Sequence, residues 1–213
     1  MGVTPLELNQ SWQVGKFTIA ETSPASGIFN WSYNKENPWT NTDVIRHDLF
    51  TVKSIDGTAS QTFDFEITNT NSGVAKQEFH TQSTDGIKVF GKSNFMDALV
   101  LHNYDSATAQ TFDLTKVGAL SSIERVDITG EQNNTIKLNL ASLMQAETVG
   151  SVHRLYITGN AGDVVVLVDG GANWKVTNPT TETLDLVVYN VYHVGPSGNS
   201  HDLLISQAIT NIS

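Results

Sequence analysis

The chain has 213 residues, 39% of them hydrophobic, which is enough to bury a core in one large β domain or two smaller ones. Its 12 Lys and Arg against 22 Asp and Glu give a formal charge of −10, which repels phosphate backbones, so nucleic acid is not an expected partner. The absence of cysteine excludes disulfides, zinc–thiolate sites and thiol catalysis, and no apolar run approaches the roughly 18 residues of a membrane-spanning helix.

Strand patterns dominate the chain. Residues 62–68 alternate strictly, so that their apolar side chains face one way while Asp64 and Glu66 face the other. Residues 135–140 alternate in the same way, whereas 163–169 is nearly all valine, as expected of a strand covered on both faces. Further strands are predicted at 184–193 and 202–206.

Glycine-containing turns separate these strands. Asp56-Gly57 and Asp85-Gly86 favour positive φ and tight hairpins, and further turns are predicted at 169–171 and 195–198. Only residues 141–147 have a helical pattern, for two turns at most. No repeat recurs at a fixed period, so a solenoid is not expected. The predicted fold is all-β, with one or more β-sandwiches of Ig-like or cadherin-like type and at most one short helix.

A polar stretch at residues 70–73 follows a strong strand and indicates a domain boundary. Residues 1–72, which hold three of the four tryptophans, form the first predicted part, Ig-like or cadherin-like. Residues 73–213 form the second, a β-rich module. In the alternative arrangement both parts make one domain, a split scaffold, and strand pairing across the boundary would support it.

Five phrases of the second part carry a family resemblance. They are Ser-Ile-Glu-Arg-Val-Asp-Ile-Thr-Gly at 122–130, Asn-Thr-Ile-Lys-Leu-Asn-Leu at 134–140, Gly-Asn-Ala-Gly-Asp at 159–163, Gly-Gly-Ala-Asn-Trp at 170–174 and Tyr-Asn-Val-Tyr at 189–192. In this order and spacing they resemble a module of very large repeats-in-toxin (RTX) adhesins, which Gram-negative bacteria export by type I secretion. Residues 49–71 are similar to the last two strands of the cadherin-like or Ig-like repeats of the same adhesins.

The resemblance implies a secreted, extracellular module on the bacterial cell surface, in an adhesin that supports cell adhesion and biofilm formation. The module would be a monomeric, calcium-stabilised scaffold. Its partners would be neighbouring domains of the same adhesin and, through inserted modules, a host-surface glycan or peptide. The chain lacks Gly-Gly-x-Gly-x-Asp repeats, so it is not expected to be a calcium β-roll itself.

Loop and turn aspartates are the candidate Ca²⁺ ligands, because calcium takes six to eight oxygens from carboxylates, amides and turn carbonyls. Those at strand ends beside Gly or Asn are Asp127, Asp163 and Asp169, and those in other loops are Asp85, Asp97 and Asp105. In the competing interpretation each carboxylate only accepts hydrogen bonds from its own turn. No EF-hand loop is present.

Aromatic residues give an alternative function, a carbohydrate- or peptide-binding module. Trp31 and Tyr33 fall on one face of an alternating segment, and Trp39 follows Pro38 in a predicted loop, so the three could form a sugar-stacking surface. The competing interpretation places the face of Trp31 and Tyr33 in the core of the first sheet.

Catalytic patterns are weak, and the chain is predicted not to be an enzyme. The six histidines are dispersed without metal-ligand spacing, and Ser197 lies in a Gly/Pro turn that lacks the G-x-S-x-G elbow. Asp64 and Glu66 share one polar strand face, and a glycosidase would need such carboxylates in a cleft. An accessory domain of a secreted hydrolase remains a second alternative.

Overall fold

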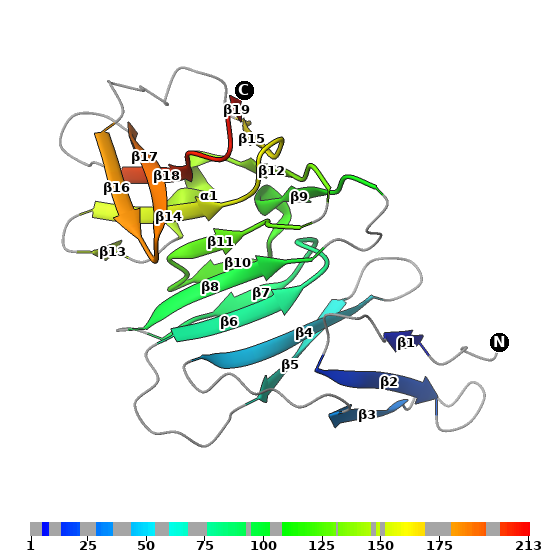
Figure 1. Ribbon diagram of the computed structural model, residues 1–213. Coiled ribbons are helices and arrows are strands. Elements are labelled where there is room, and N and C mark those ends of the chain that lie inside the picture. Colours follow the sequence, from blue (N-terminus) through cyan, green and yellow to red (C-terminus); the bar gives the residue numbers. More distant parts are fainter. Residues whose placement is uncertain are drawn as a thin grey trace.

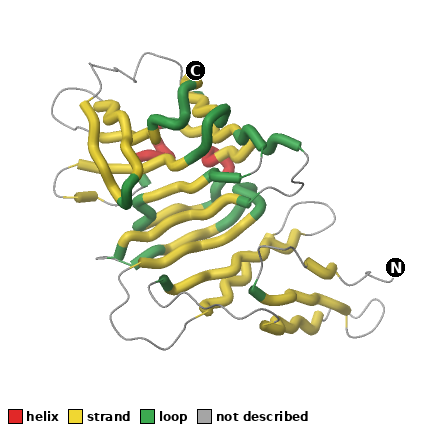
Figure 2. Tube along the Cα trace, viewed as in Figure 1, coloured by secondary structure: helices red, strands yellow, loops and turns green. Residues whose placement is uncertain are grey.

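The computed structural model describes residues 6–8, 14–21, 29–35, 44–53, 60–67, 76–92, 95–102, 108–130, 132–145, 148–149, 152–168, 180–194 and 201–213. The prediction of an all-β fold of packed sheets with at most one short α-helix is confirmed (Figures 1 and 2). No helix in these ranges is long and apolar enough to cross a membrane.

The first part of the chain begins with a three-stranded antiparallel sheet, followed by an antiparallel hairpin. The sheet has the order β1 (Leu6–Leu8), β2 (Gly15–Glu21) and β3 (Phe29–Lys35). The hairpin consists of β4 (Ile45–Lys53) and β5 (Ser60–Ile67). The strand predicted at 62–68 is therefore confirmed, and its alternation follows from its position at a sheet edge with two different faces.

A ten-stranded sheet runs through most of the molecule, and six of its strands lie parallel to one another (Figure 1). These are β4, β6 (Lys76–Thr81), β8 (Met96–Leu101), β11 (Arg125–Asp127), β14 (Val152–Thr158) and β18 (His201–Ser206). The antiparallel members are β5 at one edge, β16 (Thr180–Leu184) and β17 (Val187–Val194) at the other, and β13 (Thr148–Val149) beside β14.

Two smaller parallel sheets complete the fold. One has the order β19 (Asn211–Ile212), β15 (Val164–Leu167), β12 (Thr135–Leu138) and β9 (Thr111–Asp113). The other pairs β7 (Lys88–Phe90) with β10 (Ala119–Ser121). A 3₁₀ turn, η1 (Leu114–Lys116), follows β9, and α1 (Leu140–Met144) follows β12. One apolar cluster contains buried residues from all three parallel sheets.

The chain therefore winds in successive coils, each placing a strand beside its predecessor, and the expectation that it is not a solenoid is wrong. The coils differ in length, which removes any fixed sequence period. Along the long sheet, successive paired positions lie 20, 27, 31 and 48 residues apart, as given by the pairs Lys76–Met96, Ala98–Arg125, Arg125–Tyr156 and His153–His201.

The last long coil contains a hairpin rather than the single strand predicted at 184–193. β16 and β17 are joined by Asp185 and Leu186, whose φ values are 49° and 68°, as in a type I′ turn. Around this hairpin, Tyr156, Tyr189, Val191 and Leu204 form a second apolar cluster.

The expected boundary at residue 72 falls within one continuous sheet. Ile45–Asp48 of β4 pairs in parallel with Gln77–His80 of β6. The first part of the chain is thereby joined to the coils by backbone hydrogen bonds.

Candidate functional site

A row of polar side chains joins one corner of each coil to the next. The amide N–H of Gln110 donates to the Asn134 side chain (3.3 Å), and the Asn134 N–H donates to Asp163 Oδ1 (2.6 Å). These residues directly precede β9, β12 and β15, and the side chains of Asn134 and Asp163 each satisfy a backbone N–H one coil away. We call this row the corner ladder.

Asp163 is the buried end of the corner ladder among the described residues. Its side chain is fully buried, and its Oδ2 accepts from the Asn160 N–H at 2.5 Å. Burial raises the pKa of this carboxyl above its ordinary value, against the lowering effect of the two backbone hydrogen bonds, and nearby Asp127 raises it further. Gly159 is required beside it, because a Cβ there would lie 2.7 Å from Asp163 Oδ2.

Asp97 and Glu124 occupy a second buried corner. Asp97 Oδ2 accepts from the Lys92 N–H (2.6 Å), while the Asp97 N–H donates to Glu124 Oε2 (2.6 Å). A Cβ at Gly91 would lie only 2.2 Å from Asp97 Oδ2, so glycine is needed there for the chain to approach the carboxylate. Glu124 thus links consecutive coils, much as Asp163 does, whereas the Asp97 carboxylate accepts from the turn before its own strand.

The remaining calcium candidates are separated. Asp127 Oδ1 accepts from the N–H and hydroxyl of Thr129, a turn interaction, and Asp85 lies on an exposed turn. Asp105 and Asp169 lie outside the described residues. Within the described ranges, no three Asp, Glu or His side chains gather as a metal site. The described candidates therefore do not fit a shared Ca²⁺ site, although Asp127 and Asp163 lie close enough to interact.

The aromatic candidates of the first part contact the β4–β5 hairpin. Tyr33 stacks on Phe65 with ring centres 4.3 Å apart, and Trp31 packs at 5.6 Å from the same ring while remaining 54% exposed. Fully buried Phe17 lies behind them, 5.0 Å from Phe50. Trp39 lies outside the described residues. Tyr33 and Trp31 therefore belong to an aromatic layer between two sheets, with one edge open to solvent.

Asp48 joins the three-stranded sheet to the long sheet. Its buried carboxylate accepts from the Val14 N–H (3.2 Å), the Tyr33 hydroxyl (2.9 Å) and Arg46 Nε (2.7 Å). Burial and the neighbouring Asp48 raise the pKa of Tyr33, which keeps its hydroxyl protonated as a donor.

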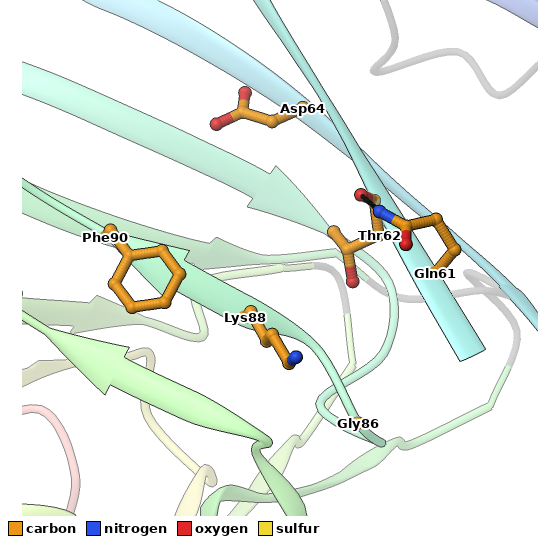
Figure 3. A pocket seen from close by; sticks show the side chains of 6 residues that line it. All are labelled: Gln61, Thr62, Asp64, Gly86, Lys88 and Phe90. Carbon is orange, nitrogen blue, oxygen red and sulfur yellow. Dashed lines mark hydrogen bonds between the residues drawn. The ribbon is translucent and has the colours of Figure 1, made fainter. Parts of the chain in front are cut away.

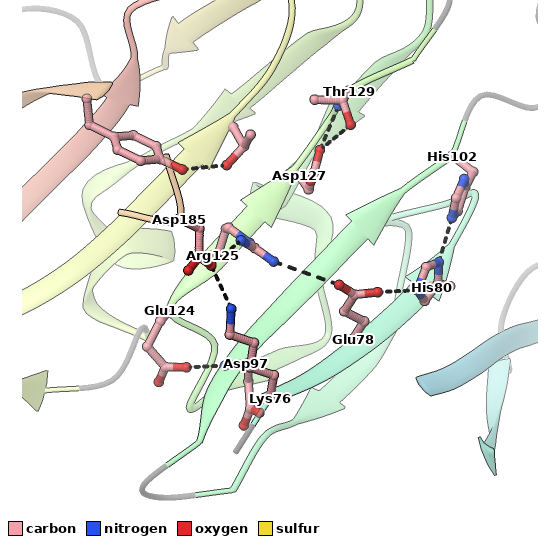
Figure 4. Close-up of polar contacts among 12 residues, drawn as sticks. Lys76, Glu78, His80, Asp97, His102, Glu124, Arg125, Asp127, Thr129 and Asp185 are labelled. Carbon is pink, nitrogen blue, oxygen red and sulfur yellow. Dashed lines mark hydrogen bonds and ion pairs between the residues drawn. The ribbon is translucent and has the colours of Figure 1, made fainter. Parts of the chain in front are cut away.

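Charged residues of distant coils meet beneath the β16–β17 hairpin (Figure 4). Asp185, at the hairpin tip, pairs with Lys76 of β6 (2.9 Å) and Arg125 of β11 (3.4 Å). Arg125 also approaches Glu78 at 3.9 Å. The Lys76 contact lowers the pKa of Asp185, so the Asp185 carboxylate is ionised at neutral pH. These contacts hold the tip of the hairpin against β6 and β11, which belong to the middle of the same sheet.

Two histidines continue this polar row toward the C-terminal ends of β6 and β8. His80 Nδ1 and His102 Nε2 are 2.7 Å apart, and His80 Nε2 contacts Glu78 at 3.2 Å (Figure 4). Burial lowers the pKa of His80 and brings that of His102 to about 3, so both rings are neutral at pH 7. The direct contact between the two ring nitrogens leaves no room for a metal between them.

A groove of about 260 Å³ lies between β5 and β7 (Figure 3). It is lined by Gln61, Thr62 and Asp64 on one side and by Gly86, Lys88 and Phe90 on the other. The sequence pattern correctly placed Asp64 on a polar strand face. The sequence offered no reason to pair that face with Lys88 and Phe90, because β5 and β7 belong to different sheets and approach each other only in the folded chain.

Comparisons with protein-family models, with curated proteins and with solved structures find no match for this chain.

Proposed function

We propose that the chain is a non-enzymatic structural module of a large RTX-type bacterial surface adhesin, holding ligand-binding modules in place outside the cell. The observation that carries this proposal is the stack of coils around one continuous apolar cluster, cross-linked by buried side chains at its corners. Each coil bonds to its neighbours along the stack, which suits a stiff element under tension. The order of the five phrases at 122–192 supplies the adhesin assignment.

A single-molecule pulling experiment tests this role. The chain is held between DNA handles attached at its two ends and stretched in optical tweezers. We expect the described parts to stay folded as one unit and to open in one dominant step, because β4 and the coils share a sheet. Gradual extension at low force, without a rupture step, would contradict a structural role.

Calcium stabilisation is a separate proposal that follows from the resemblance. With the described carboxylates engaged in turns and corners, the remaining candidates are Asp105 and Asp169. A ligand present at roughly 100 times its Kd adds about 2.7 kcal/mol of stability. For a chain of this length, this corresponds to about 5–10 °C in melting temperature.

Scanning calorimetry in millimolar calcium and in EDTA measures this shift. We expect the calcium-dependent shift to disappear in a double variant, Asp105→Asn with Asp169→Asn, and to survive in Asp85→Asn as the matched control. Identical melting curves in calcium and EDTA would refute the proposal.

A further inference from the structure

We propose that the β5–β7 groove is a binding site for a neutral sugar, in which a pyranose ring stacks on Phe90 between Asp64 and Lys88. The proposed sugar site does not depend on the proposed structural role. The two fail separately, because the pulling experiment tests the mechanical stability of the coils and the binding experiment tests this one groove. The site also differs from the Trp31, Tyr33 and Trp39 surface considered from the sequence.

The packing of the fold does not require an aromatic side chain at Phe90, which is exposed. Its side chain is 61% exposed, whereas its neighbour Val89 is 1% exposed and belongs to the core. The corresponding position in the next coil is Ser121, which is also exposed, so the fold does not need an aromatic ring here. An exposed phenyl face in a groove can pack against the apolar C–H face of a sugar ring.

The polar groups around the ring can both accept and donate hydrogen bonds. Asp64 Oδ1 contacts His47 Nδ1 at 2.8 Å, and no described residue binds its Oδ2. Lys88 is exposed and has no ion-pair partner among the described residues. The Gln61 amide donates to the Thr62 carbonyl (2.9 Å), which leaves its own carbonyl oxygen as an acceptor.

The opposite charges in the groove favour a neutral ligand. Asp64 and Lys88 project from opposite walls, with Phe90 beside them (Figure 3). A charged ligand would be attracted by one wall and repelled by the other. A neutral ligand with several hydroxyl groups can instead donate to Asp64 and accept from Lys88 at the same time. The groove of about 260 Å³ is suited to a ligand of one or two rings.

An extended peptide fits the groove less well. Ile87 and Gly91 bond to the neighbouring coil, so alternation directs the N–H and C=O of Lys88 and Phe90 to the outer edge of β7. That edge is only three residues long and carries an exposed lysine, a feature that discourages strand addition. Peptide binding is therefore the competing outcome in the experiment below.

Saturation-transfer NMR with the methyl glycosides of glucose, galactose, mannose and N-acetylglucosamine tests the proposal, using the wild-type chain and two variants. Phe90→Ser copies the residue of the next coil, and Leu186→Ala removes an equally apolar side chain that is 97% exposed outside the groove. We expect at least one glycoside to bind the wild type and Leu186→Ala equally, and Phe90→Ser about tenfold more weakly. Unchanged melting temperatures establish that both variants are folded.

Amide shifts in ¹⁵N spectra locate the ligand. Shifts confined to residues 61–64 and 86–90 support the site. The proposal is overturned if no glycoside binds at millimolar concentration, if Phe90→Ser binds as well as the wild type, or if the shifts lie elsewhere. It is also overturned if a Thr-Val repeat peptide shifts the Lys88 and Phe90 amides while the glycosides do not.

Discussion

At the scale of single residues, buried acids in this protein act as acceptors for backbone donors of adjoining turns and coils. Asp163 receives two N–H groups, from Asn134 and Asn160, and Asp48 receives one from Val14. A carboxylate is suited to this because its two oxygens can accept from two directions. The desolvation of the charge opposes the benefit: burial, together with nearby Asp127, raises the pKa of Asp163 despite its hydrogen bonds.

Asp163→Asn should therefore change the pH dependence of stability. A carboxyl whose pKa is raised on folding stabilises the protein fully below its unfolded value, near 3.8, and loses that contribution as the pH rises through the folded value. We expect the wild type to lose stability relative to Asp163→Asn as the pH increases from below 3.8 to 7, measured by urea unfolding of both proteins. A constant difference would mean that ionisation of Asp163 does not contribute, and an opposite slope that its hydrogen bonds dominate.

At the scale of elements, alternation predicted the strands but not their partners. The patterns at 62–68 and 135–140 gave β5 and β12, because a half-buried strand has a period of two wherever it pairs. Parallel neighbours such as Ala98 and Arg125 lie far apart in sequence, and nothing local encodes their register. For the same reason the sequence indicated Asp64 as polar but not the groove opposite β7, and it left Asp127 and Asp163 as equivalent turn aspartates.

The β16–β17 hairpin also escaped prediction, because the second residue of its turn is unusual. A type I′ turn favours Asn or Asp followed by Gly, whereas here Leu186 follows Asp185 at positive φ. The run at 184–193 consequently reads as one strand. Leu186 is 97% exposed, so it gains almost nothing from packing to offset its backbone conformation.

Leu186→Gly should stabilise the protein. A non-glycine residue in the left-handed region costs about 1 kcal/mol, and glycine adopts it without a steric penalty. We expect the free energy of unfolding, measured by chemical denaturation, to rise by about 0.5–1 kcal/mol. The greater flexibility of glycine in the unfolded chain keeps this gain below the full cost. The matched control is Val188→Gly in the neighbouring strand, which should be destabilised. A loss of stability in Leu186→Gly would show that the side chain has a contact beyond this turn.

At the scale of the whole molecule, β4 connects the three-stranded sheet to the coils. β4 pairs with β6, and Asp48 ties the three-stranded sheet to the same strand through Val14 and Tyr33. The aromatic layer of Phe17, Tyr33 and Phe65 then fills the space between the sheets. Unfolding the first part alone would expose this layer, and separating it from the coils would break the β4–β6 row of backbone hydrogen bonds, which favours cooperative behaviour.

The two parts should therefore unfold together, and tryptophan fluorescence can show it. Three of the four tryptophans lie in residues 1–72, so the variant Trp174→Phe confines the signal to the first part. We expect its fluorescence transition in urea to coincide with the far-ultraviolet circular dichroism transition, which reports all sheets. Asp48→Ala in the same background removes the acceptor of two contacts between the sheets and should separate the two midpoints, with fluorescence changing first. Separate transitions in the Trp174→Phe protein itself would instead indicate two independent domains, divided near residue 72.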